Sequence, residues 1–234
     1  MRRIGLGVLF AALASMLAAQ AYLGDTEMTL EQSYSPESVE LIIIREQSRS
    51  NSREAKMTAL EYIAAAIKRG SKSDEIRSSL EYLALEGVVN VARENGRVVN
   101  SFPDVRRQAA VYLGLLGTPE AKTTLLKIAG SDNDPMVITE ALKSLAAIGS
   151  NDSEEVNLVA RTLNRFHTVN PDNMVALSAL NIFEKAAAAN NGLWDRFVIE
   201  TITRVSESRS YIASVRNRAK LLLEDLKKYR LNQG

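Results

Sequence analysis

The chain has no cysteine and only one histidine among its 234 residues. Disulfide bonds are therefore excluded, and the folded state has to be held together by packing and polar contacts. Metal sites built from thiolates or from several imidazoles are excluded for the same reason, and no acidic loop of the EF-hand type is present. The sequence thus gives no reason to expect a metal or any other cofactor.

Aromatic residues are also scarce, at 6% of the chain, although hydrophobic residues make up 46%. This balance favours a core of packed helices rich in alanine and leucine over an aromatic sheet core. The formal net charge is only +1. Because the chain lacks the basic excess that marks many nucleic-acid-binding proteins, we expect no nucleic acid among its partners.

Residues 1–21 have the pattern of a secretory signal peptide. Arg2 and Arg3 give a positive start, and the run from Ile4 to Leu17 is uncharged and apolar. The small residues at Ala19 to Ala21 suit cleavage after the last of them. An uncleaved anchor is the alternative, but the apolar run is shorter than the roughly 20 residues that span a bilayer. We expect an exported protein, periplasmic or secreted, with no stable membrane span after cleavage.

Residues 22–35 are polar without clear periodicity and are predicted to form a flexible lead. A helix should begin at Pro36, because the preceding serine is a good N-cap and proline suits the first position of a helix. The run Val39 to Ile44 is ambiguous, since its β-branched residues also suit a strand. We interpret it as part of a helix that caps a single domain at 36–229, followed by a tail at 230–234.

One pattern of apolar residues recurs along the chain. The segment Asp104 to Gly117 places five of them on one face of a helix. Similar stripes start near Val137, Val175 and Val215, at intervals of roughly 32 to 40 residues, which is the length of a helical hairpin, and an earlier copy precedes them. This predicts an all-α fold, an α-solenoid of stacked helical hairpins. The five residues are Val105, Ala109, Ala110, Leu113 and Leu116.

The first helices of the hairpins are expected near residues 53–69, 104–116, 135–148, 172–190 and 211–229. The second helices are expected near 73–94, 119–129, 153–167 and 193–207. Prolines mark several starts, with Thr118, Asp134 and Asn170 before them as N-caps. The helix at 73–94 contains Gly87, where we expect a kink or break. Residues 95–102 are expected to form an irregular loop, and such loops often carry function.

Two segments carry a resemblance to a known family. Pro103 to Gly130 reads PDVRRQAAVYLGLLGTPEAKTTLLKIAG, and Asp134 to Gly149 reads DPMVITEALKSLAAIG. Both resemble HEAT repeats, in particular the short bacterial type first noted in phycobilin lyases. The resemblance implies a HEAT-like or armadillo-like superhelix in which the second helices line a concave surface.

No catalytic residues can be carried over from this resemblance. Some HEAT-repeat proteins are iron hydroxylases with paired His-Glu motifs, but His167 is followed here by Thr168. P-loops, nucleophile elbows and dinucleotide fingerprints are missing as well. We interpret His167 as a structural residue at a helix C-terminus rather than a general base or metal ligand.

The expected function is therefore that of a non-enzymatic interaction scaffold for a protein partner. Solenoids expose long surfaces and need no chemistry to act in this way, and assembly of an envelope structure would suit an exported scaffold. The alternative is a small-ligand-binding or lyase-like HEAT-repeat enzyme. That alternative would need a deep pocket with convergent polar side chains.

The candidate partner-binding residues lie on the second helices, away from the apolar stripe. They would form a mildly basic ridge, and an ordinary solvated face is the alternative. Trp194 is expected either to anchor its hairpin or to serve as an exposed contact. Arg106 and Arg216 share a repeat position and are expected to support packing between repeats by reaching a neighbouring acidic side chain or a helix end. The ridge residues are Lys127, Arg161, Asn164, Arg165, Arg196 and Arg204.

If residues 1–21 are removed on export, the mature chain begins at Tyr22. N-terminal sequencing of the native protein should return that residue, because the small side chains at Ala19 and Ala21 fit the cleavage site. Retention of Met1 on the native protein would contradict the prediction of a cleaved signal peptide.

Overall fold

The computed structural model describes residues 36–149 and 151–231. The signal peptide and lead predicted at 1–35 lie outside the described residues, as does the end of the predicted tail. Helix α3 (Pro36–Arg49) contains the boundary between two units of the chain, and the second unit begins at Ile43. The ambiguous run at 39–44 is helical, as predicted. Within the described ranges, no helix combines the length and the apolar character needed to cross a membrane.

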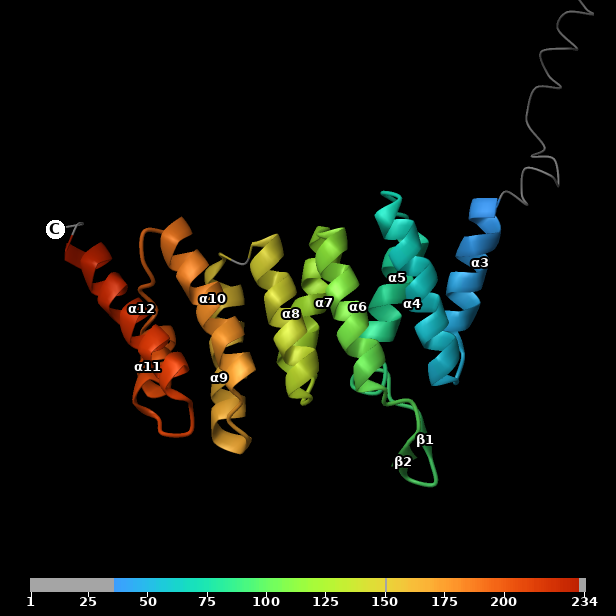
Figure 1. Cartoon of the computed structure of the whole chain (residues 1–234). Helices are drawn as coiled ribbons and strands as arrows, with labels where there is room; N and C mark the ends of the chain where they lie inside the picture. The colour runs from blue at the N-terminus through green and yellow to red at the C-terminus, as the bar shows by residue number, and fades with distance from the viewer. Residues whose placement is uncertain (1–35, 150, 232–234) are drawn as a thin grey trace, which may run out of the picture. The chain divides into compact units, whose positions relative to one another are not determined.

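The second unit is a stack of helical hairpins (Figure 1). The first helices α4, α6, α8, α10 and α12 pack against one another in that order, and the second helices α5, α7, α9 and α11 form a second layer. This is the predicted α-solenoid. The helices are α4 (Arg53–Lys68), α5 (Asp74–Leu85), α6 (Pro103–Leu116), α7 (Pro119–Ser131), α8 (Pro135–Ile148), α9 (Ser153–Val169), α10 (Asn173–Ala189), α11 (Arg196–Glu207) and α12 (Ala213–Leu231).

The shared apolar stripe forms the core between the two layers. In each first helix, most residues at the equivalent positions are buried, in agreement with the repeat alignment made from the sequence, while Ala55, Ile148 and Leu223 are half-buried. Lys220 of α12 is exposed at the position of the buried Ala110 of α6. A polar residue is tolerated there because no described helix follows α12. The buried stripe residues include Ala59, Leu60 and Ile63, then Val105, Ala109 and Leu113, then Val137, Ala141 and Leu145, then Val175, Ala179 and Phe183, then Val215 and Ala219.

Small residues allow the first helices to approach closely. A Cβ atom at Gly114 of α6 would lie only 2.4 Å from Oγ of Ser144 on α8. The Ser144 hydroxyl donates to the carbonyl of Ala110 at 3.0 Å and so satisfies its hydrogen bond across the same contact. Glycine is required here by space, although glycine within a helix costs about 1 kcal/mol relative to alanine.

In two of the hairpins, a buried ion pair joins the two helices at the end away from their connecting turn. Arg106 of α6 lies with its Nε 2.6 Å from Oδ2 of Asp132, the residue that caps the end of α7, and both side chains are buried. Lys56 of α4 lies with its Nζ 2.7 Å from Oε2 of Glu86, which caps the end of α5. Each pair ties the start of a first helix to the end of the second helix in the same hairpin.

The prediction for Arg106 is therefore confirmed, since it pairs with Asp132 at the end of α7 and also donates to the carbonyl of Glu86 at the end of α5, in the preceding hairpin. Lys56 occupies the equivalent repeat position and was missed, because a lysine near the start of a helix usually lies in solvent. Arg216, the third basic residue at this position, donates instead to the carbonyl of Tyr211 in the preceding loop.

The helix predicted at 73–94 breaks at Gly87, as expected, where φ is +76°, but the prediction of helix beyond that residue was wrong. Helix α5 ends at Leu85, and the chain continues into a small antiparallel hairpin of strands β1 (Arg93–Glu94) and β2 (Arg97–Val98). Asn95 and Gly96 at its tip both have positive φ, as an Asn-Gly turn between two strands requires. The same feature replaces the irregular loop expected at 95–102. Asn100 anchors its base by accepting from the amide of Ala92 at 2.9 Å.

Two of the three predicted N-caps are confirmed. Thr118 accepts from the amide of Ala121, and Asp134 accepts from those of Met136 and Val137. The prediction for Asn170 was wrong, because this residue follows the end of α9 while Asp172 caps the start of α10. An aspartate after the proline gives α10 a charged N-cap, which suits the positive end of the helix dipole.

The contribution of a buried ion pair to stability can be measured against that of a partly exposed pair with the same separation. Arg106→Met should destabilise the protein by about 3–5 kcal/mol, because it leaves Asp132 buried without its counter-ion. Arg218→Met removes an equally close pair, with Arg218 Nη2 2.6 Å from Glu184 Oε2, but those side chains are about one-third exposed. Its cost should stay within about 1 kcal/mol. Equal losses in urea unfolding would contradict a special role for the buried pair.

Candidate functional site

The six predicted ridge residues divide into two free cations and four residues with structural partners. Lys127 of α7 and Arg161 of α9 are exposed, and neither makes an ion pair with any of the described residues. Helices α7 and α9 run side by side in parallel, since Lys122 pairs with Glu155 at 2.7 Å and Thr162 donates to the carbonyl of Ala129 at 2.9 Å. This register sets Lys127 and Arg161 at neighbouring levels on adjacent helices.

Arg165 caps the end of α7 and is not a free surface cation. Its guanidinium donates to the carbonyls of Gly130 at 2.7 Å, Ala129 at 3.1 Å and Asp132 at 2.8 Å. Partial burial lowers the pKa of Arg165 from its usual value, an effect opposed by the charge of Asp132. The carbonyls at a helix C-terminus carry partial negative charge, so the arginine satisfies them while joining α9 to α7.

Asn164 and Arg204 fasten α9 to α11. The amide of Asn164 donates to Oγ1 of Thr201 at 2.6 Å, and its carbonyl oxygen accepts from Arg204. Arg196 is exposed and forms an ion pair with Glu200 on its own helix, at 2.7 Å. All three lie on the second helices as predicted, and Asn164 and Arg204 are committed to contacts between helices, whereas Arg196 remains almost fully exposed.

His167 lies against a buried tyrosine. Its Nδ1 is 3.3 Å from the hydroxyl of Tyr211, which belongs to the loop before α12. Burial lowers the pKa of His167, and repulsion from Arg204 lowers it further. Burial, with a smaller contribution from Asp172, raises the pKa of Tyr211 to about 12. Both groups are therefore neutral near pH 7, and burial outweighs the helix dipole that would favour a charged histidine at the end of α9.

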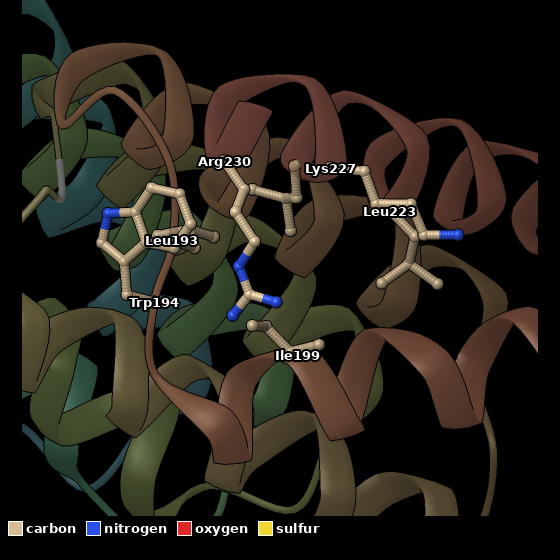
Figure 2. Close-up of a pocket in the computed structure, with 7 residues that line it drawn as sticks. Leu193, Trp194, Ile199, Leu223, Lys227 and Arg230 are labelled. Atoms are coloured by element: carbon tan, nitrogen blue, oxygen red, sulfur yellow. The ribbon is translucent and has the colours of Figure 1, made fainter. Parts of the chain in front are cut away.

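An apolar groove opens between α11 and the last turns of α12 (Figure 2). It holds about 500 Å³ of empty space open to solvent. Four aliphatic side chains line it, together with Trp194 and two cations, and no acidic side chain does. The lining residues are Leu193, Trp194, Ile199, Leu223, Leu226, Lys227 and Arg230.

Trp194 has features of both roles considered from the sequence. Its ring packs against the backbone of Gly192, where a Cβ atom would lie 2.5 Å from Cζ2 of the indole. The side chain nevertheless remains 45% exposed, and the guanidinium carbon of Arg230 lies 6.0 Å from the ring centroid. A tryptophan fixed on one face and open on the other is a suitable contact for a partner. The sequence alone did not bring Arg230 or Lys227 to this residue, because they come from the distant end of the chain.

The lowered pKa of His167 predicts that the stability of the protein depends on pH. Because the folded state lowers the pKa of His167, protons bind the unfolded chain more readily, and stability rises with pH in this range. This stability is complete above the ordinary histidine pKa of about 6.5 and is lost as pH falls toward the lower folded value. The melting temperature of the wild type should therefore fall more between pH 7.5 and 5.5 than that of His167→Gln. Parallel curves for the two proteins would contradict this account.

Comparison with known proteins agrees with this architecture. Residues 96–165 match the family described as HEAT repeats. The matched segment includes helices α6, α7 and α8 and most of α9, where the free cations and the buried Arg106–Asp132 pair lie. The search of curated proteins found no match. The family match and the stack of hairpins together support a HEAT-repeat protein with an α-solenoid fold.

Proposed function

We propose that this chain is an exported, non-enzymatic scaffold that binds a protein partner through the layer of second helices. The observation that supports this most directly is a pair of exposed cations, Lys127 and Arg161. They lie at neighbouring levels on α7 and α9 and have no counter-ion among the described residues. HEAT repeats are commonly protein-interaction scaffolds, which supports a protein as the partner. Export is supported by the predicted signal peptide at residues 1–21.

The surroundings of the two cations explain how this layer would serve as a binding surface. Arg165 joins α9 to the end of α7, and Asn164 with Arg204 joins α9 to α11. These contacts hold three successive second helices in fixed register, so a partner would meet a surface that needs little rearrangement before binding. Preorganisation of this kind reduces the free-energy cost of association.

The chemistry of the surface favours acidic side chains on the partner. Lys127 and Arg161 remain hydrated in the free protein, so pairing with them would add modest affinity and faster association rather than a large binding energy. Several such contacts spread over neighbouring hairpins would add together along the stack. Assembly of an envelope structure is a role in which such a scaffold would act.

The test begins with affinity capture from envelope extract using the mature chain, followed by titration with the purified partner. Lys127→Glu combined with Arg161→Glu should weaken binding at least about tenfold, equivalent to about 1.4 kcal/mol, and reduce its salt dependence. The melting temperature should change little, because neither side chain supports the fold.

The matched control combines Lys68→Glu with Lys143→Glu, which changes net charge equally on exposed positions of the first helices. This control should bind like the wild type. If the control pair disrupts the complex and the second-helix pair does not, the binding face has been assigned to the wrong layer.

A further inference from the structure

One side of the groove is formed by Leu193 and Trp194, which directly precede the N-cap of α11. Asp195 caps α11 by accepting from the amides of Phe197 at 2.8 Å and Val198 at 3.2 Å. The side chain of Asn157 donates to the same carboxylate at 3.0 Å from α9. These bonds anchor the start of α11, so the preceding Leu193 and Trp194 are held over the groove (Figure 2).

The indole is held in place before any ligand arrives. Gly192 has a φ of +127°, and any side chain there would collide with the tryptophan ring. The ring therefore rests on bare backbone at one side and leaves its remaining surface open to the groove that Ile199 and Leu223 also line. A preset aromatic wall with aliphatic neighbours is suited to receive one apolar side chain, because little ordering is left to be done on binding.

The rim of the groove carries positive charge without compensation. Lys227 and Arg230 lie about one turn apart on α12, and among the described residues neither makes an ion pair. The neighbouring Lys228 differs, since its Nζ lies 2.7 Å from Oδ1 of Asp225. The negative end of the α12 dipole, equivalent to about half a charge, would offset only part of the two cations.

We propose that this groove binds a short acidic segment of a protein partner. One aliphatic or aromatic side chain of that segment inserts between Trp194, Ile199 and Leu223, and carboxylates on either side of it pair with Lys227 and Arg230. The groove is shallow and open to solvent, so it suits one side chain of a longer segment rather than an enclosed small molecule. Charge complementarity favours an acidic segment over a symmetric contact between the same groove of two copies, because no acidic side chain lines the groove.

The proposal rests on the proposed function in one respect, that the natural ligand is a protein. It adds a second site, at the C-terminal end of the stack, that recognises a linear segment rather than a folded surface. The layer of second helices and the groove would then contribute separately to the affinity for one partner, as linked binding sites do.

Trp194 is the only tryptophan of the chain, so its fluorescence reports on the groove directly. The probe is a capped ten-residue peptide with phenylalanine and leucine between glutamates. One matched peptide has lysine for each glutamate, and another has serine for each apolar residue. Only the acidic apolar peptide should give a saturable shift of the Trp194 emission, and its affinity should fall as salt is added. Binding of the basic peptide with equal affinity, or no binding of the acidic one up to about 1 mM, would overturn the proposal.

Variants localise the effect. Lys227→Glu combined with Arg230→Glu should lower the affinity for the acidic peptide at least about tenfold in calorimetric titration. Lys220→Glu combined with Lys228→Glu makes the same charge change on exposed positions of the same helix outside the groove and should leave binding within about twofold. Gly192→Ala should displace the indole, change its emission in the free protein and weaken binding of the peptide, with the total helix content by circular dichroism unchanged. Equal effects of the two charge-reversed pairs would mean that general charge alone governs binding.

The remaining outcomes separate this proposal from its alternatives. If sedimentation shows a dimer that the Lys227 and Arg230 variant converts to a monomer, the groove is an interface between copies and the proposal fails. Peptide binding uses only purified chain, so its failure leaves the second-helix face untouched. If instead the Lys127 and Arg161 variant binds the captured partner normally while peptide binding persists, the second-helix face fails and the groove stands.

Discussion

The buried contact between Arg106 and Asp132 is the constraint on which the rest of the stack depends. Two charges removed from water cost several kcal/mol each, and their attraction offsets this only when the geometry is close and the remaining polar atoms are paired. Here the pair is 2.6 Å apart, and Arg106 donates further to the carbonyl of Glu86. The contact fixes the start of α6 against the end of α7, and Lys56 with Glu86 repeats it one hairpin earlier.

The same aspartate links the core to the surface. The Asp132 side chain binds Arg106, while its carbonyl accepts from Arg165 of the next second helix. In the following hairpin the position equivalent to Arg106 holds the buried Ile138, so no such pair closes it. Arg165 instead holds α9 against α7, and this register brings Lys127 and Arg161 to neighbouring levels. The exposed cations therefore owe their arrangement to polar contacts between α9 and the C-terminal end of α7.

The sequence predicted the parts of this structure that depend on local pattern. The apolar stripe, the prolines at helix starts and the caps at Thr118 and Asp134 all reflect short-range physics. The hairpin at residues 93–98 was missed although Asn95-Gly96 signals it, because the helical pattern before it was extended too far. The role of Arg165 could not be predicted, since a polar residue off the stripe looks the same whether it faces solvent or a helix end. The groove depends on Trp194 and Arg230, which only the packing of α11 on α12 brings together.

Hydrogen exchange on the complex of the mature chain with its captured partner tests the central claim most directly. Peptides covering α7 at 119–131 and α9 at 153–169 should exchange more slowly in the complex than in the free protein, because the partner covers the second helices. Peptides covering α6 at 103–116 and α8 at 135–148 should exchange at unchanged rates. Slower exchange confined to the first helices, with the second helices unaffected, would contradict the account.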